Sequence, residues 1–348
     1  MDFYLIALLG FVLSFALVFI IMKPFIEALK LHNINQEVSE YALDEYKAKA
    51  KTPIMGGLLF VVLPVIAFFI IDFKAFNDKN CMLAVVSFAL FCLVGFADDI
   101  LIIIRKDNNG LSPSVKLMME FFFSIIIFVL FRDVLTFSID IPFINGGLSL
   151  RWFIYLPLVI LMFLGEANAV NFTDGMDGLC AGTSLIGLIG FAVLTIFCQQ
   201  YNLFIFIVCV CGGLVAYLFY NLYPAKVFMG DSGSLALGGL FSALALVTNK
   251  EIALLLIGGV FLIEMFCVCL QLSCVKLFKR RIFSYTPIHY AFVLKGHKEV
   301  KVVNGFWILA IILTIIGVFI GLNWWNIFIT TKDCLKSSTG LTMLKRKI

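Results

Sequence analysis

Three aspartates, two adjacent and one far along the chain, have side chains of the kind that holds a metal ion beside a phosphate. Asp98 and Asp99 are adjacent, and adjacent carboxylates repel each other unless a cation lies between them. Asp231 stands between Gly230 and Gly233, whose small size lets a phosphate approach the backbone. Mg²⁺ takes one or two carboxylate oxygens and leaves its other positions to water and substrate phosphates. We therefore predict that Asp98, Asp99 and Asp231 are catalytic, with Asp231 as a Mg²⁺ ligand.

Basic side chains lie beside these carboxylates along the chain. Phosphoryl transfer spreads negative charge over oxygens, and a metal ion together with lysines neutralises that charge. Lys51, Lys116 and Lys226 have the required position. Other interpretations stay open. Each lysine also fits an anchor at a membrane surface, the adjacent aspartates also fit a helix end that faces water, and Asp231 also fits a helix N-cap.

Four polar residues recur at a spacing of three in the segment 168–178. They are Asn168, Asn171, Asp174 and Asp177. If this segment is helical, the spacing lines up the four side chains as a stripe, which predicts a site for a sugar, a base or a metal. An irregular turn rich in Asn, Asp and Gly is the alternative.

Near the C-terminus, a basic segment and two polar residues of an apolar run complete the set of candidates. Residues 276–304 contain seven lysines and arginines together with His289, which fits a donor to phosphate or a proton-transfer group near neutral pH. A structural histidine is the alternative for this single residue. The same segment also fits a surface attracted to anionic lipid. Glu264 and Gln271 are seven residues apart, nearly on one helix face, and a glutamate inside a membrane normally faces a partner or a cavity. We predict a catalytic role for His289 and substrate binding for the other two.

The elements that position these residues are membrane-spanning helices. Of the 348 residues, 62% are hydrophobic and only 14% are charged, which excludes an ordinary water-soluble domain. Apolar runs of about 20 residues, the length that crosses a bilayer as a helix, recur along the whole chain. We predict an all-α polytopic membrane bundle with ten spans, near residues 3–22, 54–71, 81–97, 115–131, 152–165, 182–199, 202–220, 233–248, 251–275 and 304–323. The ninth span is long enough to break at Gly258-Gly259.

Ten spans place both termini on the same side of the membrane, and basic residues predict which side. The breaks after odd-numbered spans hold sixteen Lys and Arg residues if Lys116 is counted with its loop, and the breaks after even-numbered spans hold five. The positive-inside rule then places the carboxylate clusters in the cytoplasm and both termini outside. We predict one domain over 1–323. The tail 324–348 holds five basic residues and would lie outside, which fits a poorly ordered or surface segment, or a span count that is off by one.

Five motifs, in this order, closely resemble the phospho-N-acetylmuramoyl-pentapeptide-transferase family of the polyprenyl-phosphate N-acetylhexosamine-1-phosphate transferase superfamily. They are TPIMGG (52–57), GFADD (95–99), NAVNFTDGMDGL (168–179), PAKVFMGDSGS (224–234) and LKGHKEVKVV (294–303). The resemblance covers nearly the whole chain. It implies Mg²⁺-dependent transfer from UDP-N-acetylmuramoyl-pentapeptide to undecaprenyl phosphate, giving lipid I and UMP, on the cytoplasmic face of a bacterial plasma membrane. It leaves a homodimer open and implies no nucleic-acid partner.

The resemblance also implies individual roles. Asp98 would activate the lipid phosphate with Asp99 as its partner, and Asp231 would hold Mg²⁺. Asn221 and Phe228 match positions that contact the uridine, Phe228 by stacking on the base. The remaining residues implied for the same cleft are Lys51, Asn171, Asp174 and Gln271.

Two departures from the family pattern keep other functions open. The family's Pro-x-His-His-His-Phe-Glu stands here as Pro287-Ile-His289-Tyr290-Ala-Phe-Val293, and Gly305 replaces an arginine before Phe-Trp. A related transferase acting on UDP-N-acetylglucosamine is therefore an alternative. Rivals from other classes are a membrane transporter, which predicts charges near mid-span and paired broken helices, and a scaffold that binds substrate without turnover.

Overall fold

The computed structural model describes residues 3–32, 34, 49, 52–105, 110–142 and 147–322. The first half of this part contains α1 (Phe3–Leu31), α3 (Gly56–Ile71), the 3₁₀ helix η2 (Phe73–Asn77), α4 (Lys79–Arg105), α5 (Pro113–Leu130), the paired two-residue strands β1 (Ser138–Ile139) and β2 (Leu148–Ser149), and α6 (Trp152–Thr173). The second half contains α7 (Leu179–Phe197), α8 (Tyr201–Asn221), α9 (Asp231–Thr248), α10 (Glu251–Ile257), α11 (Gly259–Phe278), α12 (Ile288–Leu294) and α13 (Glu299–Gly321).

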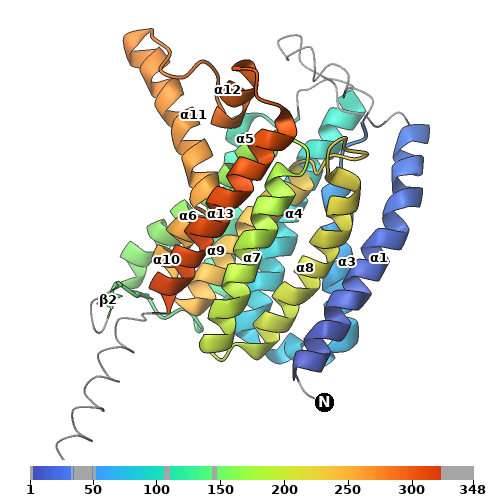
Figure 1. The fold of residues 1–348 in the computed structure, drawn as a ribbon. Coiled ribbons are helices and arrows are strands. Elements are labelled where there is room, and N and C mark those ends of the chain that lie inside the picture. The colour runs from blue at the N-terminus through green and yellow to red at the C-terminus, as the bar shows by residue number, and fades with distance from the viewer. Residues whose placement is uncertain are drawn as a thin grey trace, which may run out of the picture.

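The described residues form a bundle of helices with almost no strand, which confirms the predicted all-α membrane bundle (Figure 1). Within the described ranges, nine helices are long and apolar enough to span a membrane, and α3 is a shorter apolar helix of 16 residues. The predicted ninth span is divided at Gly258 into α10 and α11, so the break expected at the glycine pair is present. Figure 1 shows that α1 begins and α13 ends at the same end of the bundle. The predicted tail 324–348 lies outside the described residues.

Three helices are longer than their apolar runs suggested. α1 continues to Leu31 and α6 continues to Thr173, beyond the predicted ends at 22 and 165. α4 continues to Arg105, so Asp98 and Asp99 lie within a helix and not at its end. Successive side chains on a helix are 100° apart, so these two carboxylates point to different neighbours. The interpretation of the pair as a helix end facing water is therefore wrong.

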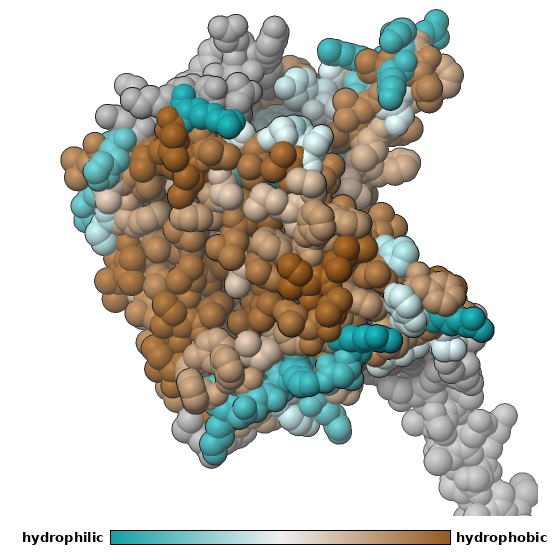
Figure 2. All heavy atoms as spheres, turned by 180° about the vertical axis from the view of Figure 1, so that it is seen from behind, coloured by the Kyte–Doolittle hydropathy of each residue, from teal (hydrophilic) through white to brown (hydrophobic). Residues whose placement is uncertain are grey.

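The outer surface carries a broad apolar belt between two polar margins (Figure 2). Large apolar side chains such as Ile70, Phe122 and Ile315 are more than half exposed on different helices. An apolar surface of this extent is stable in hydrocarbon and not in water. The chain is therefore a multi-pass membrane protein.

α9 lies at the centre of the bundle, and glycines let its neighbours approach it closely. Its residues are buried almost without exception. Gly95 of α4 touches the start of α9, where a Cβ atom on Gly95 would lie 2.0 Å from the carbonyl oxygen of Asp231. Gly57 of α3 meets Gly233 of α9 in the same manner, with 2.4 Å from such a Cβ to the Gly233 Cα. These contacts fix where the first turn of α9 lies.

We predict that Gly95→Ala lowers the free energy of unfolding by about 1–3 kcal/mol, because the added methyl group forces α4 away from α9. Thermal unfolding in detergent measures this. Gly165→Ala in α6 is the matched control, since a Cβ there meets nothing within 4 Å. Equal stability of the two variants would show that the α4–α9 contact does not fix the helix position.

Candidate active site

One of the adjacent aspartates, Asp99, is hydrogen-bonded to the first turn of α9. The Asp99 carboxylate accepts hydrogen bonds from the backbone N–H groups of Asp231 and Ser232, both at 3.0 Å. It thus caps α9 from a neighbouring helix, where a negative charge also meets the positive end of the helix dipole. Gly230 precedes the helix with φ +73, and a Cβ there would lie 2.7 Å from the Asp99 Oδ2 atom. Asp231 is the first helical residue, so its interpretation as the N-cap is wrong.

The Asp231 side chain does not cap its own helix and instead contacts residues of three other helices. The Lys116 Nζ atom from α5 forms an ion pair with Asp231 Oδ2, and the Asn171 amide from α6 donates to Asp231 Oδ1 at 2.7 Å. Asn171 also donates to the Ser234 hydroxyl oxygen at 2.9 Å. The Asp98 carboxylate is close enough to Asp231 to interact with it directly, and it accepts from the Leu111 N–H at 2.8 Å. The candidates Asp98, Asp99, Lys116, Asn171 and Asp231 therefore meet at one end of the bundle.

A buried glutamate that the motifs do not contain supports this cluster. Glu120 follows Lys116 by one helical turn of α5, and its Oε2 atom accepts from the Asn168 amide at 2.7 Å. Asn168 also donates to the carbonyl oxygen of Leu164 at 2.8 Å. Asn168 therefore binds protein groups in this structure, and it positions α6 against α5.

The predicted stripe is helical only in its first half. Asn168 and Asn171 lie on α6, whereas Asp174 follows the last helical residue and Asp177 lies in the turn before α7. The Asp177 carboxylate binds Lys49 at 2.7 Å and the N–H of Ala225 at 2.9 Å. Its own N–H donates to Glu299, which also pairs with Lys49 at 2.7 Å. Asp177 therefore ties the turn to two distant segments, and the continuous stripe is not formed.

The loops before α3 and α9 are joined by backbone hydrogen bonds. Phe228 donates to the carbonyl of Pro53 and accepts from Gly56, both at 2.8 Å, and Gly57 donates to Met229 at 2.8 Å. Asn221 is buried and uses its side chain inside the protein, between the N–H of Gly178 and the carbonyl of Val227, both at 3.0 Å. The half-buried Phe228 ring keeps its predicted role open. Lys226 lies over the Tyr220 ring. Lys51 lies outside the described residues.

α12 packs on the turn that contains Asp174. His289 is fully buried, and its Nδ1 atom lies 3.2 Å from Glu264 Oε1 without the alignment of a hydrogen bond. The Glu264 carboxylate accepts the N–H groups of Ile288 and His289, at 2.7 and 3.2 Å. Tyr290 donates its hydroxyl to the carbonyl of Gly175 at 2.8 Å. His289 and Glu264 therefore hold α12 beside the site, and neither contacts the carboxylate cluster here.

Gln271 has a comparable structural contact. Its Oε1 atom accepts the N–H groups of Ile282 and Phe283, at 2.9 and 3.0 Å, and its amide donates to the carbonyl of Phe283 at 3.1 Å. It closes the loop between α11 and α12. The predicted substrate contacts of Glu264, Gln271 and Asn221 stay predictions, because each side chain is engaged with the protein itself in this structure.

The carboxylate cluster fits a divalent cation. Among the described residues, no three His, Cys, Asp or Glu side chains converge as a ligand group. Mg²⁺ needs only one or two carboxylates, with substrate oxygens and water completing its shell. The neighbouring carboxylates of Asp98 and Asp231 provide such a pair, and Lys116 forms an ion pair with Asp231.

Asp174 is the acidic residue next to this cluster that lies outside the spans. Burial, together with the neighbouring charges of Asp231, Asp99 and Asp177, raises its pKa from 3.8 to about 8. The folded protein therefore binds a proton that the unfolded chain releases above pH 3.8. Between about pH 4 and pH 8 this group makes stability fall as the pH rises, and above pH 8 its contribution becomes constant.

We predict that Asp174→Asn reduces the loss of thermal stability between pH 5 and pH 8, measured without metal or nucleotide. Asp133→Asn, at an exposed aspartate whose pKa is lowered by Lys79, is the control and leaves that slope unchanged. If both variants show the slope of the unaltered protein, Asp174 is ionised in the folded state.

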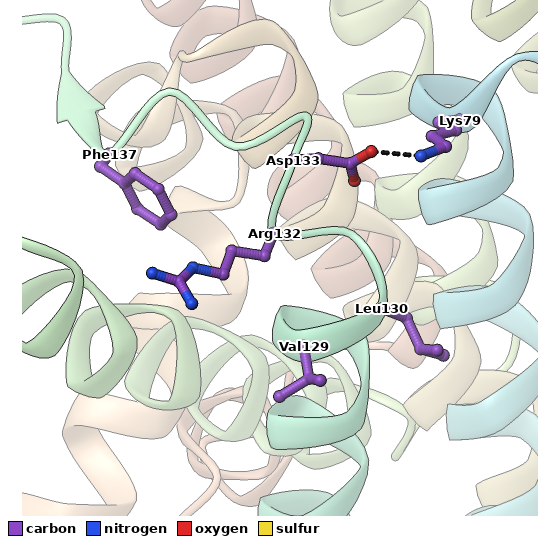
Figure 3. A pocket seen from close by; sticks show the side chains of 6 residues that line it. All are labelled: Lys79, Val129, Leu130, Arg132, Asp133 and Phe137. Atoms are coloured by element: carbon purple, nitrogen blue, oxygen red, sulfur yellow. Dashed lines mark hydrogen bonds and ion pairs between the residues drawn. The ribbon is translucent and has the colours of Figure 1, made fainter.

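The opposite end of the bundle carries a different kind of pocket (Figure 3). It is lined by Lys79, Val129, Leu130, Arg132, Asp133 and Phe137. Lys79 forms an ion pair with Asp133, and the Arg132 guanidinium lies over the Trp152 ring, 5.7 Å from its centroid. With a single carboxylate that is already paired, this pocket lacks the acidic character of the cluster at the start of α9.

A membrane helix bundle with carboxylates, a lysine and amides gathered at one end is suited to an enzyme acting on phosphates, and residues 81–249 match glycosyl transferase family 4. Phospho-N-acetylmuramoyl-pentapeptide-transferases from Staphylococcus epidermidis and Staphylococcus haemolyticus are each 38% identical to the chain, over 90% of it and 98% of the relative. The corresponding protein of Staphylococcus aureus is 38% identical over 92% of the chain and 99% of the relative.

The chain therefore belongs to the phospho-N-acetylmuramoyl-pentapeptide-transferase family, and it is a phospho-sugar transferase. This confirms the resemblance carried by the five motifs. It also speaks against the transporter interpretation, since the acidic residues of the cluster gather at one end of the bundle and not at its middle.

Proposed function

We propose that this protein transfers phospho-N-acetylmuramoyl-pentapeptide from UDP-N-acetylmuramoyl-pentapeptide to undecaprenyl phosphate, which gives lipid I and UMP. The observation that carries the proposal is the meeting of Asp98, Lys116, Asn171 and Asp231 from four helices at one end of the bundle. Relatives that share 38% identity over nearly their whole length are named for this transfer.

In the proposed reaction, an oxygen of the lipid phosphate attacks the β-phosphorus of the UDP-sugar in line with the leaving group. The bond between the β-phosphorus and the bridging oxygen breaks, and UMP leaves with that oxygen. Asp98 accepts a hydrogen bond or a proton from the lipid phosphate, since its carboxylate faces Asp231 across the site. Lys116 and the Asn171 amide stabilise the negative charge that develops on the transferred group.

Asp231, with Asp98 facing it, would hold Mg²⁺. A bound Mg²⁺ supplies positive charge that neutralises the diphosphate oxygens and orients them. Asp99 does not contact substrate in this proposal. It fixes the first turn of α9, and hence the Asp231 carboxylate, by accepting two backbone N–H groups. His289 positions α12 beside the turn of Asp174.

We further propose that the site faces the cytoplasm of a bacterium and that the bundle lies in its plasma membrane. The basic residues of the chain are concentrated in the breaks at the end where α9 begins. The positive-inside rule assigns such an end to the cytoplasm, which is also where a nucleotide-activated sugar is available.

The test is release of UMP by the purified protein in detergent, with UDP-N-acetylmuramoyl-pentapeptide, undecaprenyl phosphate and Mg²⁺. We expect turnover that depends on all three. Replacing the donor by UDP-N-acetylglucosamine in a parallel reaction is expected to give little UMP. Faster turnover with UDP-N-acetylglucosamine would assign the protein to the related transferases, and no turnover by a folded protein with either donor would contradict the proposed function.

A further inference from the structure

A groove outside the acidic cluster runs between α12 and the first half of α13. It has a volume of about 300 Å³. Its lining includes Phe292, His297, Lys301, Gly305, Phe306 and Leu309. Three of these are apolar side chains and two are basic, and no acidic side chain lines it. The groove therefore suits a molecule that is both apolar and anionic.

The polarity of the groove changes along α13. Lys301, Gly305 and Leu309 are spaced by four residues, so they lie on one face of the helix, about 12 Å from first to last. α13 begins at the end of the bundle that carries the carboxylate cluster and runs towards the other end (Figure 1). The positive charge therefore lies at the membrane margin, and the apolar part extends into the hydrocarbon region. A phospholipid has its phosphate and its acyl chain in the same order.

Gly305 makes the groove deep enough for a chain. A Cβ atom added at this position would meet nothing within 4 Å, so the space beside the helix is open. The Phe292 and Phe306 rings form one wall, in edge-to-face contact with their centroids 6.1 Å apart. Phe292 is exposed although it is a large apolar residue, which is stable where a lipid chain covers it.

The charge of the groove is not cancelled by its neighbour on α13. Glu299 pairs with Lys49 and accepts the N–H of Asp177. Lys301 follows two residues later and is rotated by 200° around the helix, so it points away from Glu299 and its partners. Lysines at a membrane margin attract anionic headgroups.

We propose that the α12–α13 groove binds one anionic phospholipid, with its phosphate at Lys301 and His297 and an acyl chain over Gly305 beside Phe292 and Phe306. The lining of the groove favours a phospholipid over the polyprenyl phosphate acceptor. None of Asp98, Lys116, Asn171 and Asp231 lines it, whereas an acceptor must present its phosphate to these residues. The site is therefore separate from the proposed reaction.

The test uses phosphatidylglycerol with a photoactivatable diazirine in one acyl chain. The full-length protein is placed in phosphatidylcholine nanodiscs with this probe, illuminated, and mapped by peptide mass spectrometry. We expect saturable labelling of the α12–α13 groove, competed by unlabelled phosphatidylglycerol. Gly305→Leu fills the groove and is expected to lower the labelling at least fivefold. Lys301→Gln is expected to raise the amount of competitor needed about fivefold.

Two matched variants serve as controls. Gly165→Leu places the same side chain at another helical glycine with open space around it. Lys295→Gln removes an exposed lysine that does not line the groove. Neither is expected to change the labelling. Three results would overturn the proposal. They are labelling that Gly305→Leu leaves unchanged, equal competition by phosphatidylcholine, and competition by undecaprenyl phosphate in place of phosphatidylglycerol.

Discussion

Asp231→Asn is expected to lower the rate of UMP release about 10³-fold, because it removes the charge that Lys116 and the proposed cation share. The backbone of residue 231 keeps its hydrogen bond to Asp99, so the first turn of α9 stays in place. The rate is measured at saturating concentrations of both substrates, and thermal unfolding of the same preparation shows whether the fold is retained.

Asp140→Asn is the matched control for this prediction. Asp140 forms an ion pair with Lys250 near the opposite end of the bundle, and the side-chain exposures of 15% for the lysine and 23% for the aspartate equal those of Lys116 and Asp231. The loss of one half-buried ion pair is therefore the same in both variants. A similar decrease in rate for the two would mean that Asp231 acts only through stability.

Asp99→Asn is expected to lower the free energy of unfolding by about 1–3 kcal/mol and the rate of UMP release about 100-fold. The carboxylate uses both oxygens, one for the N–H of Asp231 and one for that of Ser232. An asparagine has one oxygen, and its amide would face the second N–H group. The first turn of α9 then shifts, and the Asp231 carboxylate moves with it.

Asp78→Asn is the control for Asp99→Asn, because it weakens a helix cap far from the carboxylate cluster. At the far end of the bundle, Asp78 Oδ1 accepts the N–H groups of Asn80 and Cys81 at the start of α4, at 3.0 and 3.3 Å, and its Oδ2 accepts from the Asn202 amide at 2.8 Å. This variant is expected to lower stability and leave the rate unchanged. If Asp99→Asn reduces the rate no more than Asp78→Asn does, Asp99 does not position Asp231 for the reaction.

The architecture could be predicted because its cause is local. Apolar runs long enough for a bilayer give the spans, and the glycine pair at 258–259 gives the break between α10 and α11. Chain segments between spans fall alternately at the two ends of the bundle, so the clusters around Asp98, Asp174 and Asp231 had to share one end. The structure confirms that they do, and it places Asp98 and Asp231 in direct proximity.

The parts that could not be predicted depend on partners far away in the chain. α4 continues past its two aspartates because the start of α9 satisfies Asp99, and no local spacing reveals a cap from another helix. The stripe is broken after Asn171 because α6 ends at Thr173 and the turn that follows binds Lys49 and Glu299 through Asp177. Glu120 was missed although it follows Lys116 by four residues, the helical spacing that places both side chains on one face.

Binding of Mn²⁺ in place of Mg²⁺, followed by electron paramagnetic resonance, tests the central claim that Asp231 holds a cation with the diphosphate. With UDP-N-acetylmuramoyl-pentapeptide present, we expect one Mn²⁺ bound per chain in the unaltered protein and in Asp140→Asn, and none in Asp231→Asn. Undiminished, nucleotide-dependent Mn²⁺ binding by Asp231→Asn would contradict the account.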